Sequence, residues 1–262
     1  MGLPPELDEA FARARGRLKP LAGRVLYFTT IGSTNDVAAS LAVDPASFGT
    51  VVIADAQTAG RGRRGRTWFS PAGSGLYISV ILSPSRAASA PDRATRLLTL
   101  AAGLALAEGV ERATGLAPAI KWPNDLLVAR RKLAGILAEA FGEAVVLGYG
   151  INVGPMSYPP ELRDRATSLE TELGRPIDRA MVAVETLAAL ASRYGDLVSS
   201  RFDAILDAWR RRAPTHQGAQ VVWDTPAGPQ SGITDGIDDS GALLVRIGDR
   251  VERIVAGEVR WI

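Results

Sequence analysis

The chain of 262 residues contains no cysteine and a single histidine, His216. The lack of cysteine excludes disulfides, thiolate zinc sites and a cysteine nucleophile. One imidazole cannot build a multi-histidine metal site, and because His216 lies in a loop punctuated by proline and glycine, a Ser-His-Asp hydrolase is disfavoured. Chemistry must therefore rest on Arg, Lys, Asp, Asn and Gln side chains, on backbone groups and on a hydrated metal ion.

Lysine is scarce as well. Of the 30 basic residues only Lys19, Lys121 and Lys132 are lysines, so 27 are arginines. A lysine ammonium is a compact point charge, whereas an arginine guanidinium is a planar fork, and the two differ at sites with strict geometry. Lys121 and Lys132 are therefore candidates for functional positions, against the alternative that two surface lysines escaped the bias by chance.

No apolar run is long enough to cross a bilayer, which takes about 20 residues. The N-terminus carries acidic residues where a signal peptide has basic and then apolar ones. The net charge of +2 does not by itself indicate a nucleic-acid partner. We expect a cytoplasmic protein that makes no membrane contact.

Hydrophobic periodicity predicts a large domain over residues 1–213 and a small one over 214–262. In the large domain we expect strands at 24–30, 50–57, 75–83, 119–128, 132–141 and 144–153, and helices at 1–20, 33–43, 92–114, 178–194 and 201–212. The first helix is expected to pack loosely, Ser33 and Asp92 to be N-caps, and Gly115 to end its helix. Short polar turns between the last three strands favour antiparallel hairpins. Five short strands with Gly, Asp and Pro turns after residue 214 indicate a small β-barrel.

The most informative segment is a glycine- and arginine-rich loop between two predicted strands. Residues 60–66 place three glycines among four arginines. Glycine lets the backbone approach an anion closely, and arginine supplies forked donors, so the loop is predicted to bind phosphate. A solvated basic loop without function is one alternative. An RNA-binding segment is another, although such segments are usually long and disordered, and this single copy has Trp68 at its exit.

Three further motifs are weaker when each is taken alone. In the run 121–125, Pro123 is expected to force a strand edge or a bulge that directs Asn124 and Asp125 outward, unless the run is a plain turn. The run 132–137 places Lys132 at a strand entry, with Gly135 where backbone contact is close. In the run 148–153 two glycines alternate, which puts both on one face, open to a flat ligand.

Together and in this order, the motifs resemble the biotin–protein ligase family over most of the chain. The matching runs are residues 33–35, 57–66, 121–125, 132–137 and 148–152, and residues 232–244 resemble the family's small SH3-like domain. The resemblance implies an α/β (α+β) catalytic domain similar to class II aminoacyl-tRNA synthetases, with a mainly antiparallel sheet, followed by a C-terminal SH3-like β-barrel. Tyr149 stands where the family pattern has a smaller aliphatic residue.

The resemblance also implies a reaction. Biotin and ATP, with Mg²⁺, would form biotinyl-5′-AMP, and the biotinyl group would pass to a lysine of the biotin carboxyl carrier protein of acyl-CoA carboxylase. Carried over by motif, the catalytic residues would be Arg63, Lys132 and Asp125, with Asp125 as the base for the acceptor lysine. Biotin would be bound by Ser33, Thr34, Asn35, Gln57, Gly60, Arg61, Trp68, Lys132, Gly135 and Gly148. The nucleotide would be bound by Arg61, Arg63, Arg64, Arg66, Lys121, Asn124 and Asn152. No residue is assigned to a metal.

Three other functions compete with this interpretation. A lipoate–protein ligase shares the same superfamily. A transcriptional repressor would need an N-terminal helix-turn-helix, and since about twenty residues precede the first predicted strand, too few for that module, no direct DNA binding is expected. A non-enzymatic RNA-binding protein would show steeply salt-dependent RNA affinity without binding biotin.

Overall fold

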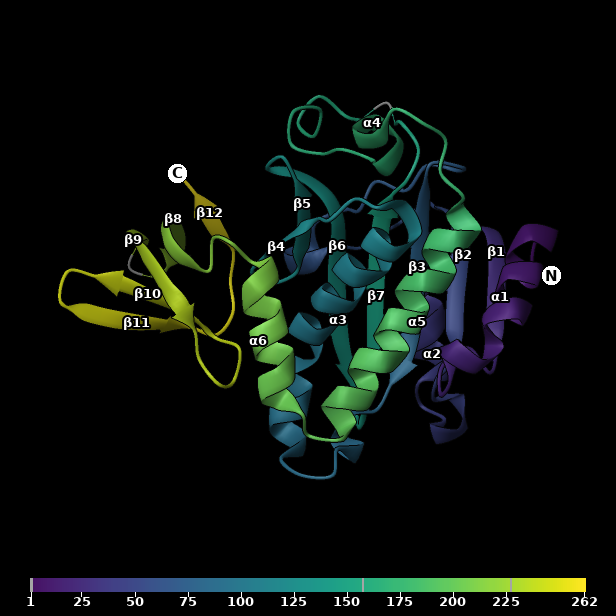
Figure 1. Ribbon diagram of the computed structural model, residues 1–262, viewed down its shortest axis with the longest axis horizontal. Helices are drawn as coiled ribbons and strands as arrows, with labels where there is room; N and C mark the ends of the chain where they lie inside the picture. The colour runs from purple at the N-terminus through teal and green to yellow at the C-terminus, as the bar shows by residue number, and fades with distance from the viewer. Residues whose placement is uncertain (1, 157, 227) are drawn as a thin grey trace.

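The computed structural model describes residues 2–156, 158–226 and 228–262 and contains two sheets, which lie at different ends of the molecule (Figure 1). The large sheet has the strand order β1-β2-β3-β7-β6-β5-β4. Its strands are β1 (Val25–Ile31), β2 (Val51–Gln57), β3 (Gly75–Leu82), β4 (Ala119–Lys121), β5 (Asp125–Val128), β6 (Arg131–Phe141) and β7 (Ala144–Asn152). Every neighbouring pair is antiparallel except β1 and β2, which are parallel because a helix carries the chain back between them. The predicted α/β class with a mainly antiparallel sheet is confirmed.

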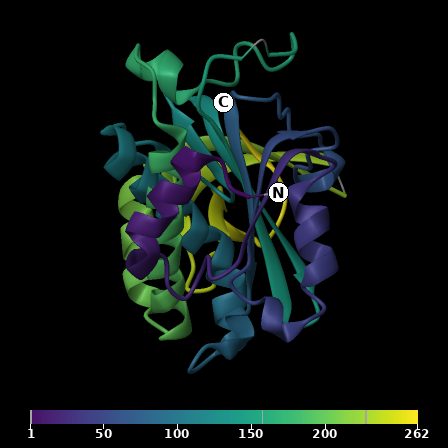
Figure 2. The same cartoon turned by 90° about the vertical axis from the view of Figure 1, so that its right-hand side faces the viewer.

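Helices cover the two faces of this sheet unequally. One face is packed by α1 (Pro5–Leu18), α3 (Pro91–Thr114), α5 (Arg179–Val198) and α6 (Phe202–Arg212). The opposite face carries α2 (Thr34–Leu41), seen on the other side of the sheet in Figure 2. There Ala38 of α2 packs against Val52, Ile81 and Val146 of the central strands. Beyond α2, that face is left to loops, and it is where the candidate site lies.

Two expectations about the helices are wrong. The first helix is not loosely packed, because Phe11, Ala14 and Leu18 are buried. The long helix α3 begins at Pro91 with Ala90 at the N-cap position, so Asp92 lies in the first turn and does not cap it. Its negative charge still favours that end of the helix dipole. Gly115 ends α3 as predicted, with a φ of 82° that favours glycine. One helix, α4 (Leu169–Leu173), had no sequence prediction.

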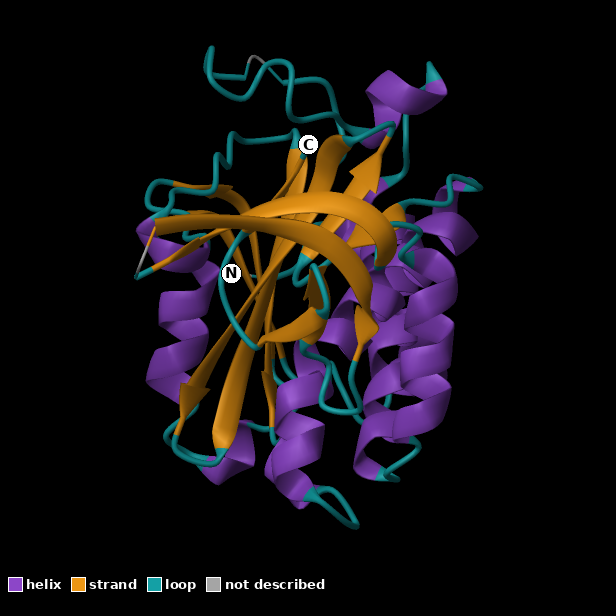
Figure 3. Ribbon diagram, turned by 90° about the vertical axis from the view of Figure 1, so that its left-hand side faces the viewer, coloured by secondary structure: helices purple, strands orange, loops and turns teal. Residues whose placement is uncertain are grey.

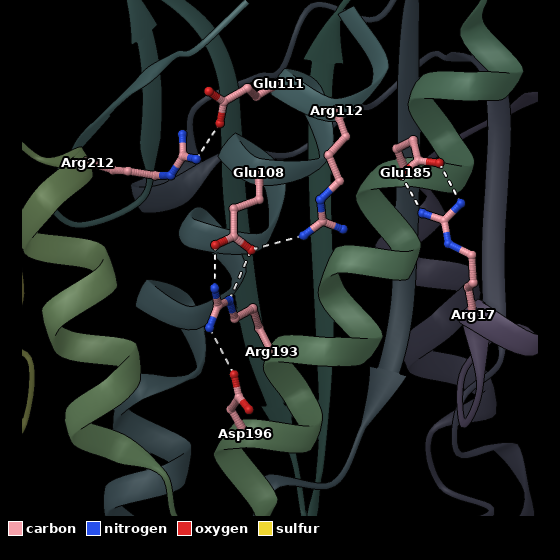
Figure 4. A network of polar contacts seen from close by, with 8 residues as sticks. All are labelled: Arg17, Glu108, Glu111, Arg112, Glu185, Arg193, Asp196 and Arg212. Atoms are coloured by element: carbon pink, nitrogen blue, oxygen red, sulfur yellow. Dashed lines mark hydrogen bonds and ion pairs between the residues drawn. The ribbon is translucent and has the colours of Figure 1, made fainter. Parts of the chain in front are cut away.

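Ion pairs connect the helices on the packed face (Figure 4). Arg193 of α5 donates from Nε to Glu108 of α3 at 3.0 Å and from Nη1 to Asp196 at 2.9 Å. Arg212 of α6 binds Glu111 of α3 in the same layer. The fourth helix, α1, is joined to α5 because Arg17 of α1 binds Glu185 of α5 through both terminal guanidinium nitrogens. These pairs link α1 to α5, and both α5 and α6 to α3.

The small sheet is antiparallel throughout, with the strand order β11-β10-β9-β8-β12. Its strands are β8 (Gln217–Thr225), β9 (Gly228–Ile237), β10 (Leu243–Ile247), β11 (Arg250–Ile254) and β12 (Val259–Trp261). They curve strongly, as the view onto this end shows (Figure 3). The two ends of the molecule share one apolar core, and the indole of Trp122 donates to the Gly241 carbonyl oxygen at 3.0 Å across their junction.

Helices long and apolar enough to serve as membrane spans are not found among the described residues.

The contact between α3 and α5 generates a prediction. A methyl group at Gly109 would lie 2.4 Å from the Cα of Thr186, so Gly109→Ala must push the two helices apart. We expect a loss of about 1–3 kcal/mol in the free energy of unfolding, measured with urea. Gly195→Ala is the matched control, because nothing lies within 4 Å of the place its methyl would take and it should gain about 0.5–1 kcal/mol from helix propensity. A gain in both variants would contradict this packing.

Candidate functional site

The candidate site is a cavity on the sheet face beside α2. Strands β6 and β7 form its floor, the start of α2 and the end of β2 form one wall, and the glycine- and arginine-rich loop of residues 58–74, here called the Gly/Arg loop, covers it. Eleven of the predicted site residues line this cavity. They are Ser33, Thr34, Asn35, Gln57, Arg61, Arg63, Trp68, Asn124, Lys132, Gly135 and Gly148.

The floor consists of glycine backbone. Gly135 of β6 and Gly150 of β7 are partners across the ladder, and Gly148 lies two residues away on the same face. A methyl at Gly150 would lie 2.2 Å from Nε1 of Trp68, and a methyl at Gly148 would lie 1.9 Å from Oδ1 of Asn35. The Trp68 and Asn35 side chains can lie this close to the sheet only because Gly150 and Gly148 have no Cβ atoms.

The sequence had predicted that the glycine face is open to a flat ligand. In the structure this face is instead covered by protein side chains. The indole of Trp68 lies over Gly135 and Gly150, at the position predicted for a flat ligand. Its buried Nε1–H has no hydrogen-bond partner in the described structure. A buried donor without a partner is unfavourable by about 1–3 kcal/mol, so the indole gains little hydrogen-bonding energy by staying there. A flat ligand would have to displace or restack this ring.

A chain of neutral hydrogen bonds forms one end of the cavity. Gln57 Oε1 accepts from the Thr34 backbone N–H at 2.9 Å and from the Thr34 hydroxyl at 3.1 Å. Ser79 of β3, which is fully buried, lies 2.8 Å from the Thr34 hydroxyl oxygen and 2.6 Å from Oδ1 of Asn35. Ser33 occupies the N-cap position of α2 without making a side-chain cap, so its hydroxyl does not serve the helix.

Glu139 continues this chain toward the Gly/Arg loop. Its Oε2 accepts from Asn35 Nδ2 at 2.8 Å and from Arg61 Nη2 at 2.5 Å. Arg61 also lies 3.1 Å from Asp36 of α2. Sequence reasoning missed Ser79 and Glu139. A buried serine inside the apolar run of β3 is a detectable signal for Ser79, whereas nothing in the local sequence marks Glu139.

The other end of the cavity is cationic. Lys132 Nζ lies 2.7 Å from Asp125 Oδ1 and 5.3 Å from the centroid of the Trp68 ring. Arg63 donates from Nη1 to Asn124 Oδ1 at 3.0 Å. Burial lowers the pKa of Arg63, and the nearby Asp125 carboxylate opposes this shift. Two partly buried cations thus lie at the mouth of a glycine-floored cavity, an arrangement suited to an anionic group.

The run from Lys121 to Asp125 is a turn and not the bulged strand that was expected. It joins β4 to β5, with Lys121 paired to Asp125 across the hairpin and a cis peptide bond between Trp122 and Pro123. Proline has no N–H to donate, so the ladder stops there. The turn directs Asn124 back into the site, where Nδ2 donates to the Ile136 carbonyl oxygen at 2.8 Å and Oδ1 meets Arg63.

Several predicted site residues lie outside the cavity. Asn152 donates to the Thr167 carbonyl oxygen at 2.9 Å and thereby holds the chain that follows β7. Lys121 lies 5.7 Å from the ring centroid of Trp261, and burial lowers the pKa of its amine. Gly60 supports the base of the Gly/Arg loop, where a methyl would lie 2.5 Å from the Trp68 carbonyl oxygen.

Two arginines of the Gly/Arg loop also point elsewhere. Arg64 is exposed, and Arg66 binds Glu258 of the small sheet's last turn. The large side chain of Tyr149, unexpected from the sequence, is accommodated because it faces away from the cavity. Its hydroxyl lies 3.4 Å from the Thr186 hydroxyl of α5, on the helix-covered side of the sheet.

Metal ligands were left unassigned from the sequence. Among the described residues no group of three or more His, Asp or Glu side chains could hold a metal ion. Mg²⁺ that arrives on nucleotide phosphates keeps most of its water and needs only one or two protein carboxylates.

Comparison with known proteins agrees with this geometry. Residues 27–155 match the biotin/lipoate A/B protein ligase family, and residues 218–260 match the biotin protein ligase C terminal domain. The chain is 37% identical over 263 aligned positions to the bifunctional ligase/repressor BirA of Bacillus subtilis, covering 98% of this chain and 79% of that protein. It is 39% identical to the biotin--[acetyl-CoA-carboxylase] ligase of Mycobacterium tuberculosis, covering 87% and 85%. A solved structure of biotin protein ligase from Aquifex aeolicus in complex with biotin and ATP superposes with a TM-score of 0.76 at 28% identity, covering 92% of this chain and 99% of that one.

The glycine floor generates a prediction that requires no ligand. Gly150→Ala should expel the Trp68 indole from the sheet and lower the free energy of unfolding by about 1–3 kcal/mol, measured with urea. Gly154→Ala is the control just beyond the same strand, because the nearest atom to its methyl, Glu170 Oε2, is 3.5 Å away. Equal stability of the two variants would show that the ring does not rest on the floor.

Proposed function

Because this chain belongs to the biotin protein ligase family and is a ligase enzyme, we propose that it activates biotin with ATP and transfers the biotinyl group to a carrier-protein lysine. One observation carries the proposal. A neutral polar pocket with a glycine floor opens directly onto two cations, Arg63 and Lys132. That order suits a ligand with an uncharged ring at one end and a carboxylate at the other.

In this proposal the ring of biotin lies on the backbone of Gly135, Gly148 and Gly150, and the Trp68 indole restacks against it. The ureido group has both donors and acceptors, and the chain that joins Thr34 to Gln57 offers both. The Arg61–Glu139 pair borders this end of the cavity. The valerate carboxylate then points toward Lys132.

The first step needs no protein nucleophile. A carboxylate oxygen of biotin attacks the α-phosphorus of ATP, an acyl–phosphate bond forms, and pyrophosphate leaves. Arg63 and Lys132 offset the charge that develops on the phosphoryl oxygens. Mg²⁺ bound to the nucleotide would add further charge neutralisation, and Asp125, which lies beside Lys132 and near Arg63, is the carboxylate that would hold it. The rate then depends on positioning and charge neutralisation, in keeping with a chain that has no cysteine.

The second step forms an amide. The amine of the acceptor lysine attacks the acyl carbonyl, AMP leaves, and one proton must be removed. The ordinary pKa of that amine is about 10.4, so it is almost fully protonated at neutral pH. Asp125 is our candidate base, because its carboxylate lies at the cationic end of the cavity and faces an ammonium group, that of Lys132, at 2.7 Å. The ammonium group of the acceptor lysine would approach the Asp125 carboxylate in the same way that Lys132 does.

The proposed acceptor is the biotin carboxyl carrier protein of acyl-CoA carboxylase. Support comes from relatives in Mycobacterium tuberculosis and Paracoccus denitrificans that are named biotin--[acetyl-CoA-carboxylase] ligase, the latter 37% identical over 82% of this chain. We place the reaction in the cytoplasm, where ATP and such a carrier meet, and propose no direct contact with DNA.

Lipoate is the competing substrate, since the family matched by residues 27–155 includes lipoate ligases. The match of residues 218–260 to a biotin protein ligase domain favours biotin. Calorimetry separates the two. Biotin should bind and should raise the melting temperature, and ATP should add to both effects. Lipoate at the same concentration should change neither, and a stronger response to lipoate would reverse the assignment.

Lys132 is the residue whose replacement tests the first step most simply. Lys132→Arg keeps the positive charge. The planar guanidinium group is too wide for the place where Lys132 Nζ lies, between Asp125 and the Gly135 backbone. We expect adenylation to slow by about a hundredfold or more, measured as biotin-dependent pyrophosphate exchange. Lys19→Arg, an exposed position remote from the cavity, is the control. Near-normal exchange in Lys132→Arg would rule out this role.

Arg63 is expected to retain the adenylate. Its bond to Asn124 joins the Gly/Arg loop to the β4–β5 turn, so Arg63→Gly should let the loop open and release biotinyl-5′-AMP. Free adenylate acylates lysines indiscriminately, and labelling of an added non-cognate protein should rise about tenfold or more. Arg130→Gly is the control, because Arg130 is exposed in a turn at a φ of 67° that glycine adopts easily. Labelling confined to the carrier would contradict the role of Arg63.

A further inference from the structure

We propose that Glu139 is a positioning residue for the ring of biotin, because it fixes the direction of a hydrogen-bond relay that ends at the Thr34 hydroxyl. With that direction fixed, the Thr34 hydroxyl oxygen is available to accept a hydrogen bond from an N–H group of the ligand. The inference rests on the proposed function only in taking the ligand to be biotin, whose ureido ring carries N–H donors. It gives a role to Glu139 and Ser79, to which the sequence motifs assigned none.

The relay starts at a carboxylate, which can only accept hydrogen bonds. Glu139 Oε2 accepts from Asn35 Nδ2 at 2.8 Å and from Arg61 Nη2 at 2.5 Å. The Asn35 amide is therefore held with Nδ2 toward Glu139 and with Oδ1 turned the other way. Asn35 is 4% exposed and lies on the backbone of Gly148. The carboxylate thus sets the orientation of a buried amide that lines the cavity.

The direction passes from Asn35 to Ser79 of β3. An amide oxygen has no proton to donate, so the 2.6 Å contact between Ser79 Oγ and Asn35 Oδ1 requires the Ser79 hydroxyl to donate. Ser79 has a single proton, and none remains for its other contact, with the Thr34 hydroxyl oxygen at 2.8 Å. Thr34 must therefore donate in that contact. Every bond of the relay then runs from Thr34 toward Glu139.

Gln57 fixes the other side of Thr34. Its Oε1 accepts from the Thr34 backbone N–H at 2.9 Å, and its Nε2 donates to Ser70 Oγ at 2.9 Å. The atom that faces the Thr34 hydroxyl at 3.1 Å is Oε1, which can only accept. Ser79 and Gln57 can thus take the Thr34 proton, and neither gives one. From the described residues the buried Thr34 hydroxyl oxygen receives no hydrogen bond, and it lines the cavity.

The consequence is selection for a ring that donates. A cyclic urea can offer an N–H to the Thr34 oxygen, whereas the dithiolane ring of lipoate has no hydrogen-bond donor. A site built around a hydrogen bond rejects an analogue that lacks the bonding group, because the buried partner is then left unpaired. Hydrogen bonds in a chain also polarise one another. The negative charge of Glu139 therefore makes the Thr34 oxygen a stronger acceptor.

Glu139→Met tests the relay, because it keeps the length of the side chain and removes the acceptor. The Asn35 amide can then turn over and offer Nδ2 to Ser79, which directs the Ser79 proton to Thr34. Calorimetry should show that biotin binds about tenfold or more weakly than in the unchanged protein. Steady-state kinetics should show a higher KM for biotin, with kcat and the KM for ATP unchanged.

Glu139→Gln is the conservative variant. Its carbonyl oxygen can take the place of Oε2 and accept from both Asn35 and Arg61, so the direction of the relay is kept while the charge is lost. Most of the affinity should return, to within about threefold of the unchanged protein. An affinity as low as that of Glu139→Met would show that charge matters and direction does not, and would overturn the proposal.

Asp36→Asn is the matched control for the Gly/Arg loop. Arg61 pairs with Asp36 at 3.1 Å as well as with Glu139, but Asp36 takes no part in the relay. The Asp36 side chain is 57% exposed, so its ion pair is weak, and this variant should bind biotin to within about twofold of the unchanged protein. A loss equal to that in Glu139→Met would assign the effect to the Arg61 contact and would also overturn the proposal.

A double-variant cycle tests the relay without a ligand. Ser79 and Glu139 make no hydrogen bond to each other in the described structure, and both bind Asn35. The losses in the free energy of unfolding caused by Glu139→Met and Ser79→Ala should therefore not add, and the double variant should lose less than their sum. Strict additivity, or unchanged biotin affinity in Glu139→Met, would contradict the relay. Failure of the proposed function would instead appear as no biotin binding by the unchanged protein, while the cycle would still report on the relay.

Discussion

The site depends on how closely the Gly/Arg loop approaches the backbone of β6 and β7. Gly135, Gly148 and Gly150 leave a flat stretch of sheet without side chains, and Trp68 and Asn35 rest directly on it. A Cβ atom at Gly150 would displace Trp68 of the loop, and one at Gly148 would displace Asn35 of α2. Because the floor is backbone, it is as rigid as the ladder that forms it, and only the covering layer can move to admit a ligand.

That cavity divides into two chemical environments over a short distance. The end beside α2 is a relay of neutral hydrogen bonds in which Thr34, Gln57 and Ser79 satisfy one another. The end beside the β4–β5 turn holds two cations, Lys132 and Arg63. The Asp125 carboxylate pairs with Lys132 and also lies near Arg63. An activated acyl phosphate would lie where the two environments meet.

Much of this could be predicted from the sequence where the signal is local. Alternation placed Gly148 and Gly150 on one face, β-branched runs located the strands to within a few residues, and the density of glycine and arginine located the loop. Signals that depend on distant partners could not be predicted in this way. The parallel pairing of β1 with β2, the partnership of Glu139 with Arg61 and the burial of α1 all arise from tertiary packing. Pro123 was ambiguous because a proline that stops a ladder fits a bulge and a turn equally well, and only the pairing of Lys121 with Asp125 decides between them.

The central claim is that the carboxylate of biotin is joined to the α-phosphate of ATP in this cavity, and that the acyl group is then transferred to a lysine. The most direct measurement is to incubate the purified protein with biotin, ATP, Mg²⁺ and a biotin carboxyl carrier domain, and to follow pyrophosphate release and the mass of the carrier together. We predict pyrophosphate release that depends on biotin, and a carrier that gains one biotinyl group at a single lysine. No pyrophosphate above the level without biotin, together with an unmodified carrier, would contradict the claim.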